Sequence, residues 1–147
     1  PVLLGLSSLV DLPDRLDQYM QEPTIVNNTA SIQFYQDTFS VYSLKYSTHT
    51  AQDALADIER WISRIQSDLY EIHPQQKTDL LTVLWNFHAL SAKIYGEDLC
   101  NWVLAFEHLN DALEIANTTN NSDMLASSLY RSIAIARSIE PSSTLDL

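Results

Sequence analysis

The stretch AFEHLNDALEIANTTNN, residues 105–121, decides the fold. Ala105, Ala112 and Ala116 recur at helical spacing, so they share one face of a helix, and small side chains on such a face let a second helix approach closely. The polar residues 117–121 then end the helix, and Ser122-Asp123 is a cap signal for another one. We therefore expect a tightly packed helix within a stack of helical hairpins.

Composition favours a single all-α domain. The chain has 147 residues and 46% hydrophobic content, which is enough to bury a core, and only two glycines and five prolines. Its formal net charge of -11 repels phosphate backbones and anionic lipid surfaces, which argues against direct nucleic-acid or membrane contact. The single cysteine, Cys100, excludes an intrachain disulfide, so a cytoplasmic location is the default expectation.

The N-terminal segment is apolar but short. PVLLGLSSLV, residues 1–10, cannot span a bilayer and has no basic start typical of a signal peptide, so we expect it to pack on the core. Because the chain opens on Pro1, we expect it to have been cut from a longer protein. A cap signal at Asp11 predicts a short helix over residues 11–21.

Apolar residues at intervals of three and four predict the longer helices. The first runs from Ala30 to about Ser47, and the second follows a cap signal at residues 48–50 and ends before His73-Pro74. The third has Pro74 in its first turn and stops at Gly96, a plausible left-handed terminator. The fourth is predicted to begin near residues 97–98, and the last extends from residue 122 to about residue 140.

The starts of these helices repeat. Starts near Ala30, Gln75 and Ser122 are spaced by roughly 45 residues, which suggests a repeating helical hairpin. Within the second unit, residues 74–121, the second helix resembles that of a tetratricopeptide repeat through Ala105, Phe106, Leu109, Ala112 and Leu113, and its first helix does so through Ala92 and Tyr95. This resemblance implies antiparallel helical hairpins stacked as a short, tetratricopeptide-like right-handed superhelix.

The other units depart from that pattern. Residues 30–70 resemble a degenerate first repeat in which bulky Trp61 replaces the family's alanine, so a wider helix pair is expected. Residues 122–140 resemble half a repeat, which leaves a hydrophobic face for a cap or for self-association. Residues 1–147 are thus expected to form one repeat domain.

In tetratricopeptide repeats the first helix of each unit lines a concave groove. The matching positions, as implied by the resemblance, are Asp37, Ser40, Leu44, Asn86, Lys93, Arg131 and Ile135. Among them Asn86, Lys93 and Arg131 form a polar and cationic group suited to a peptide backbone or a carboxylate. The alternative is that these three are ordinary solubilising surface residues.

The layout also resembles the sensory regions of bacterial regulators with an N-terminal helix-turn-helix of the xenobiotic-response-element type. The similarity lies in an apolar lead, an irregular hairpin containing ALADIERWISRI (residues 54–65) and then a regular repeat. It implies a non-catalytic module that binds a protein, a peptide or a signal. The alternative function is homodimerisation without a ligand.

Few residues suggest chemistry. His88 and His108 lie on adjacent predicted helices with Glu107 or Glu114 nearby, so a metal or acid–base site is the alternative to plain surface or groove histidines. Cys100 beside Leu99 is expected to be a small core residue. The leading interpretation therefore contains no catalytic, cofactor or metal site.

Overall fold

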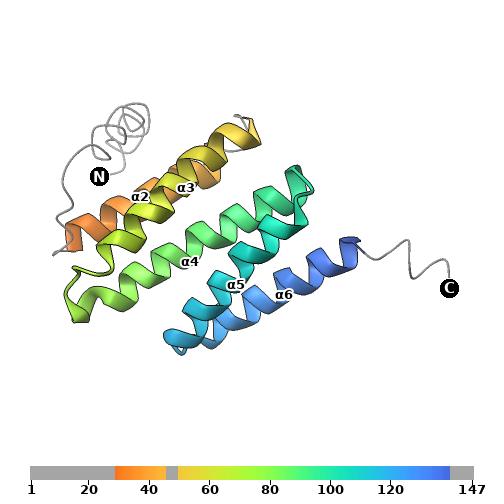
Figure 1. Cartoon of the computed structure of the whole chain (residues 1–147). Coiled ribbons are helices and arrows are strands. Elements are labelled where there is room, and N and C mark those ends of the chain that lie inside the picture. The colour runs from red at the N-terminus through yellow and green to blue at the C-terminus, as the bar shows by residue number, and fades with distance from the viewer. Residues whose placement is uncertain (1–28, 46–49, 140–147) are drawn as a thin grey trace, which may run out of the picture.

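The computed structural model describes residues 29–45 and 50–139, and these form an all-helical chain without a strand (Figure 1). The α-helices are α2 (Thr29–Lys45), α3 (Ala51–Asp68), α4 (Lys77–Lys93), α5 (Trp102–Thr118) and α6 (Ser122–Ile139). The all-α expectation is confirmed for these residues. The expected lead-in at residues 1–10, the expected helix at residues 11–21 and the C-terminal tail lie outside the described residues.

Polar side chains define the starts of the helices. Thr50 caps α3 by accepting a hydrogen bond from the Asp53 backbone N–H at 3.3 Å, as the cap signal predicts. Pro74 occupies the first turn of a short 3₁₀ segment (Pro74–Gln76) that leads into α4. The cap of α6 differs from the expectation, because Asn121 accepts from the Met124 N–H at 3.0 Å, one residue before the predicted Ser122-Asp123 signal.

The connection between α4 and α5 also differs from the expectation. A π-helical turn (Ile94–Asp98) continues α4, so Gly96 lies inside a helical turn and does not take the left-handed conformation. Cys100 takes it instead, with φ of 50°. Helix α5 begins at Trp102 rather than near residues 97–98, because the Asn101 side chain accepts a hydrogen bond from the Leu104 N–H and caps the helix there.

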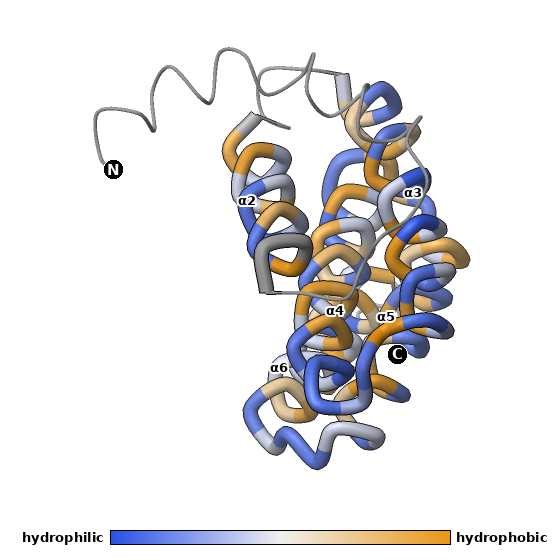
Figure 2. The backbone as a smooth tube through the Cα atoms, turned by 90° about the vertical axis from the view of Figure 1, so that its left-hand side faces the viewer, coloured by the Kyte–Doolittle hydropathy of each residue, from blue (hydrophilic) through white to orange (hydrophobic). Residues whose placement is uncertain are grey.

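The helices are stacked in chain order, with α4 in the middle (Figure 1). Helix α4 packs against α2 and α3 on one side and against α5 on the other, and α6 packs against α5 at the end of the stack. Hydrophobic and hydrophilic stretches alternate along each labelled helix (Figure 2). The core is richest along α4, where Leu80, Val83, Leu84 and Phe87 are buried.

Aromatic side chains separate α2 from α3. Trp61 on α3 is buried and contacts Phe34 and Tyr35 of α2 at ring-centroid distances of 6.0 and 5.8 Å. The Tyr35 hydroxyl donates a hydrogen bond to the buried Asp68 carboxylate, whose other oxygen lies 3.8 Å from Arg64 Nε. These contacts agree with the wider helix pair expected from Trp61.

Small residues bring α5 close to its neighbours. Ala105, Ala112 and Ala116 are all buried in α5, which packs against both α4 and α6. This is the arrangement that the opening stretch predicts. On α6, by contrast, Leu129 and Ile133 are 46% and 52% exposed, so part of its hydrophobic surface lies uncovered.

Candidate functional site

A pocket of about 540 Å³ lies between the C-terminal part of α4 with its π-helical turn and helix α6. We call it the α4–α6 groove. Its lining is mixed: Ala92 and Ile135 supply apolar surface, Lys93 and Arg131 supply positive charge, and Glu97 supplies one negative charge. The groove therefore offers apolar contacts beside two cations.

Gly96 lines this groove where α6 packs against the π-helical turn. A Cβ atom at Gly96 would lie 3.3 Å from Ile135 Cδ1 and 3.7 Å from the Ala105 Cβ. The absence of a side chain thus lets α6 lie against the π-helical turn. Arg131, one turn before Ile135, is half-buried, and its Nε donates a long hydrogen bond of 3.5 Å to the Ser127 hydroxyl.

The groove unites some of the residues expected to bind a ligand. Lys93, Arg131 and Ile135 line it together, whereas the half-buried Asn86 does not. Asp37, Ser40 and Leu44 also lie outside it, because α2 and α6 occupy opposite ends of the stack (Figure 1). Leu44 is 68% exposed, and Asp37 accepts a hydrogen bond from Gln33 on its own helix.

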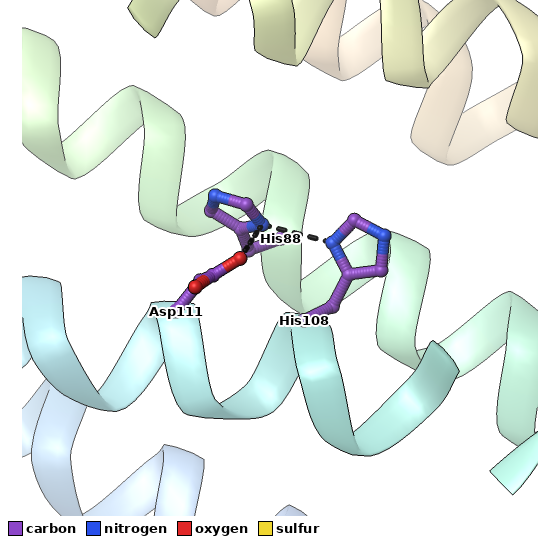
Figure 3. A group of neighbouring side chains, drawn as sticks. All are labelled: His88, His108 and Asp111. Carbon is purple, nitrogen blue, oxygen red and sulfur yellow. Dashed lines mark hydrogen bonds and ion pairs between the residues drawn. The ribbon is translucent and has the colours of Figure 1, made fainter. Parts of the chain in front are cut away.

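A second polar site lies between α4 and α5. His88 of α4 and His108 of α5 face one another with their Nδ1 atoms 2.9 Å apart, and Asp111 of α5 points toward the same place (Figure 3). The Asp111 Oδ2 atom lies 3.9 Å from His88 Nδ1. Both imidazoles are buried, yet they border an open depression of about 280 Å³.

Two further residues hold His108 in place. Glu59 of α3 lies with its Oε1 atom 2.6 Å from His108 Nε2, and the Tyr95 ring stacks on the imidazole at a centroid distance of 5.5 Å. An ionised carboxylate only accepts hydrogen bonds, so His108 Nε2 carries the proton and donates it. In neutral His108 the Nδ1 lone pair then points at His88, which donates its Nδ1–H. We call His88, His108, Asp111 and Glu59 the histidine cluster.

The environment shifts the pKa values of the cluster. Burial, and next the adjacent His108, lower the pKa of His88 to about 4, so His88 is neutral at pH 7. The hydrogen bond from His108 lowers the pKa of Glu59 and keeps it ionised. Burial raises the pKa of Asp111, and burial together with the nearby Glu59 carboxylate raises that of Tyr95.

These histidines are not plain surface residues, although both border a depression. His88 and His108 are buried and bonded to each other, because α4 and α5 pack closely enough for the rings to meet. The carboxylates closest to the two rings are Glu59 and Asp111, while the expected Glu107 and Glu114 line the depressions beside them. The position of Asp111, one turn after His108, is a signal in the sequence, whereas Glu59 comes from a distant helix and leaves none.

Cys100 also differs from its expected place. It is exposed rather than part of the core, because the left-handed turn between the π-helical segment and α5 directs it away from the packed helices. It borders the α4–α6 groove.

No protein-family model, curated protein or solved structure matches this chain. Within residues 29–45 and 50–139, no helix is both long and apolar enough to cross a membrane. The two sites are therefore interpreted from their own chemistry.

Proposed function

We propose that this chain is a non-catalytic, peptide-binding module whose helices form a short tetratricopeptide-like superhelix. The occupant of the α4–α6 groove is a short peptide that presents an apolar side chain next to a carboxylate. The observation that carries this proposal is that Lys93 and Arg131 line one pocket of about 540 Å³ together with apolar residues such as Ala92 and Ile135.

Charge complementarity supports a carboxylate. The chain carries eight basic residues against nineteen acidic ones, whereas the groove has two cations, Lys93 and Arg131, against one acid, Glu97. Arginine and lysine bind carboxylates through charge-assisted hydrogen bonds, and arginine does so with two parallel N–H groups. Beside them, Ala92 and Ile135 offer surface for an apolar side chain.

Fluorescence anisotropy tests this proposal. The probes are short labelled peptides ending in leucine or phenylalanine, each made with a free C-terminal carboxylate and with a carboxamide. We expect the carboxylate form to bind more tightly. The double variant Lys93→Ala/Arg131→Ala should weaken its binding by about tenfold or more, because each lost charged hydrogen bond contributes more than about 1 kcal/mol.

A matched control separates the groove from net charge. The variant Arg60→Ala/Lys77→Ala removes two exposed cations that lie outside the groove, with the same change in net charge. It should bind the carboxylate peptides like the native chain. If both double variants bind equally well, the groove assignment fails.

Homodimerisation is the second candidate, and the exposed face of α6 favours it. Leu129, Tyr130 and Ile133 are 46%, 74% and 52% exposed, and they share one side of the helix. An apolar face of this kind pairs with its copy in a symmetric dimer. Light scattering coupled to size exclusion, over a wide concentration range, measures whether the chain is a monomer or a dimer. A dimer that Leu129→Lys dissociates supports this candidate, and a monomer at all concentrations removes it.

The resemblance to helix-turn-helix regulators extends the proposal to a biological setting. In that setting the chain is the sensory part of a larger bacterial regulator, and another part of the regulator contacts DNA. The acidic charge of the chain supports this division, since it disfavours direct contact with nucleic acid.

A further inference from the structure

The histidine cluster brings three metal-ligating atoms to one point. One ring nitrogen of His88, one ring nitrogen of His108 and a carboxylate oxygen of Asp111 all lie within 4.8 Å of one another. In a tetrahedral zinc site with bonds of about 2.0–2.1 Å, neighbouring ligand atoms are roughly 3.3 Å apart. The two separations from His88 Nδ1, 2.9 Å to His108 Nδ1 and 3.9 Å to Asp111 Oδ2, bracket that value. Small side-chain rotations therefore bring these atoms to coordination distance.

Glu59 prepares His108 to act as a ligand. Its carboxylate accepts the Nε2–H of His108, which leaves the lone pair on Nδ1 and aims it at the centre of the cluster. Carboxylates that hold the far nitrogen of a ligating histidine in this way are the common outer neighbours of metal ions in proteins. The contact fixes both the ring orientation and the tautomer that coordination requires.

We propose that His88, His108 and Asp111 bind a divalent transition-metal ion of the Zn²⁺ class, with Glu59 as a positioning residue. Two imidazoles and one carboxylate suit Zn²⁺ and its neighbours, whereas Mg²⁺ and Ca²⁺ prefer oxygen ligands alone. On binding, the His88 proton moves from Nδ1 to Nε2 through solvent, so both Nδ1 lone pairs face the ion. This site shares no lining residue with the α4–α6 groove.

A purely structural histidine pair explains less of this arrangement. The hydrogen bond between the two rings accounts for His88 and His108, but it does not involve Asp111, whose oxygen is 3.9 Å away and beyond bonding distance. The cluster also borders the depression of about 280 Å³, which gives an ion a path from solvent. A third ligand and an entry path are what a metal site requires.

Calorimetric titration of the full chain with Zn²⁺, after removal of metals with a chelator, tests the proposal. We expect one ion per chain. Asp111→Asn should weaken binding by about tenfold or more, since it removes a charged ligand from a half-exposed position without disturbing the core. Glu107→Gln is the matched control, because Glu107 lies on the same helix and lines the same depression without belonging to the ligand set. It should bind Zn²⁺ like the native chain.

The role of Glu59 requires a spectroscopic readout. With Co²⁺ in place of Zn²⁺, the visible absorption bands report the ligand geometry. Glu59→Gln should change these bands and weaken affinity by about 10–100-fold while the far-ultraviolet circular dichroism stays the same. His73→Gln removes an exposed histidine elsewhere and should change neither.

The binding measurements distinguish a metal site from a purely structural histidine pair. Absence of saturable Zn²⁺ binding, or equal affinity in Asp111→Asn and Glu107→Gln, overturns the metal site. Because His88 is buried and its loss threatens the fold, the test rests on the carboxylate variants. The groove variant Lys93→Ala/Arg131→Ala should bind Zn²⁺ normally, so failure of one proposal leaves the other standing.

Discussion

Trp85 on α4 donates its indole N–H to the hydroxyl of Ser128 on α6 over 2.9 Å. Ser128 is buried, and its hydroxyl donates a hydrogen bond to the Met124 carbonyl at 2.8 Å. This relay joins two helices that are not consecutive in the chain. It fixes the position of α6 relative to α4, and with it the width of the groove between them.

Ser128→Ala should lower the free energy of unfolding by about 1 kcal/mol, since it removes the partner of the indole N–H while water still reaches half-buried Trp85. Urea denaturation measures the effect. Ser138→Ala is the control, because its exposed hydroxyl bonds only to its own helix and the change in helix propensity is the same. Identical urea midpoints for the two variants would show that the bond between helices contributes no stability.

Ala112→Leu should destabilise the fold by about 1–3 kcal/mol, because the larger side chain must enter a fully packed position on α5. Chemical denaturation measures this loss. Asn110→Leu places the same side chain at an exposed position of α5 and should change the stability little. If Ala112→Leu is as stable as Asn110→Leu, close helix packing is not the reason for alanine here.

The turn between α4 and α5 gives a pair of opposite predictions. Gly96→Ala should have a small effect, because Gly96 does not have a positive φ and its added Cβ would be tight only against the flexible end of Ile135, at 3.3 Å. Cys100→Gly should raise the free energy of unfolding, by less than about 1 kcal/mol, since it relieves a left-handed residue at φ of 50°. Thermal unfolding compares the two. If Gly96 had the left-handed conformation expected from the sequence, Gly96→Ala would instead lower the free energy of unfolding strongly.

Buried His88 should make stability depend on pH. Its pKa is about 4 in the folded chain against 6.5 for the free side chain, so between these values the unfolded chain binds a proton that the folded chain does not. The free energy of unfolding should therefore fall as pH drops from 6.5 toward 4, by at most about 1.4 kcal/mol per pH unit. The lowered pKa of Glu59 adds to this loss at the acid end, and the raised pKa of Asp111 opposes it.

Urea denaturation across this range, with a chelator present, measures the dependence on pH. His88→Gln should flatten the curve, whereas the exposed His73→Gln should keep the native slope. The charged and titratable groups around His88 are Glu59 from α3, Tyr95 from the π-helical turn, and His108, Asp111, Glu107 and Glu114 from α5. An unchanged slope in His88→Gln would assign the pH dependence to these neighbours.

Periodicity in the sequence predicts the helices well, because their apolar faces repeat at three and four residues and Thr50 caps α3 by a local rule. The π-helical turn is not predictable in this way. Its course depends on Ile135, which arrives from α6 and packs against Gly96. Glycine near a predicted helix end indicates a left-handed turn by local rules, but here it provides space for a neighbouring helix.

The two sites likewise differ in how far the sequence predicts them. The resemblance to a repeat singled out Lys93 and Arg131 as groove residues. Both line the α4–α6 groove. The pairing of His88 with His108 follows from adjacent helices, but their burial depends on the close packing of α4 and α5. Glu59 approaches from α3, and no local pattern indicates which residue of a distant helix reaches the ring.

Tyr95 and Gly96 are neighbours in the π-helical turn, yet they serve different sites. Tyr95 stacks on His108 and borders the histidine cluster, while Gly96 forms part of the α4–α6 groove. A ligand that shifts this turn from one side therefore alters the other side through a single backbone segment. Thermodynamic linkage makes such an effect reciprocal: if a metal ion changes the affinity for a peptide, the peptide changes the affinity for the metal by the same factor.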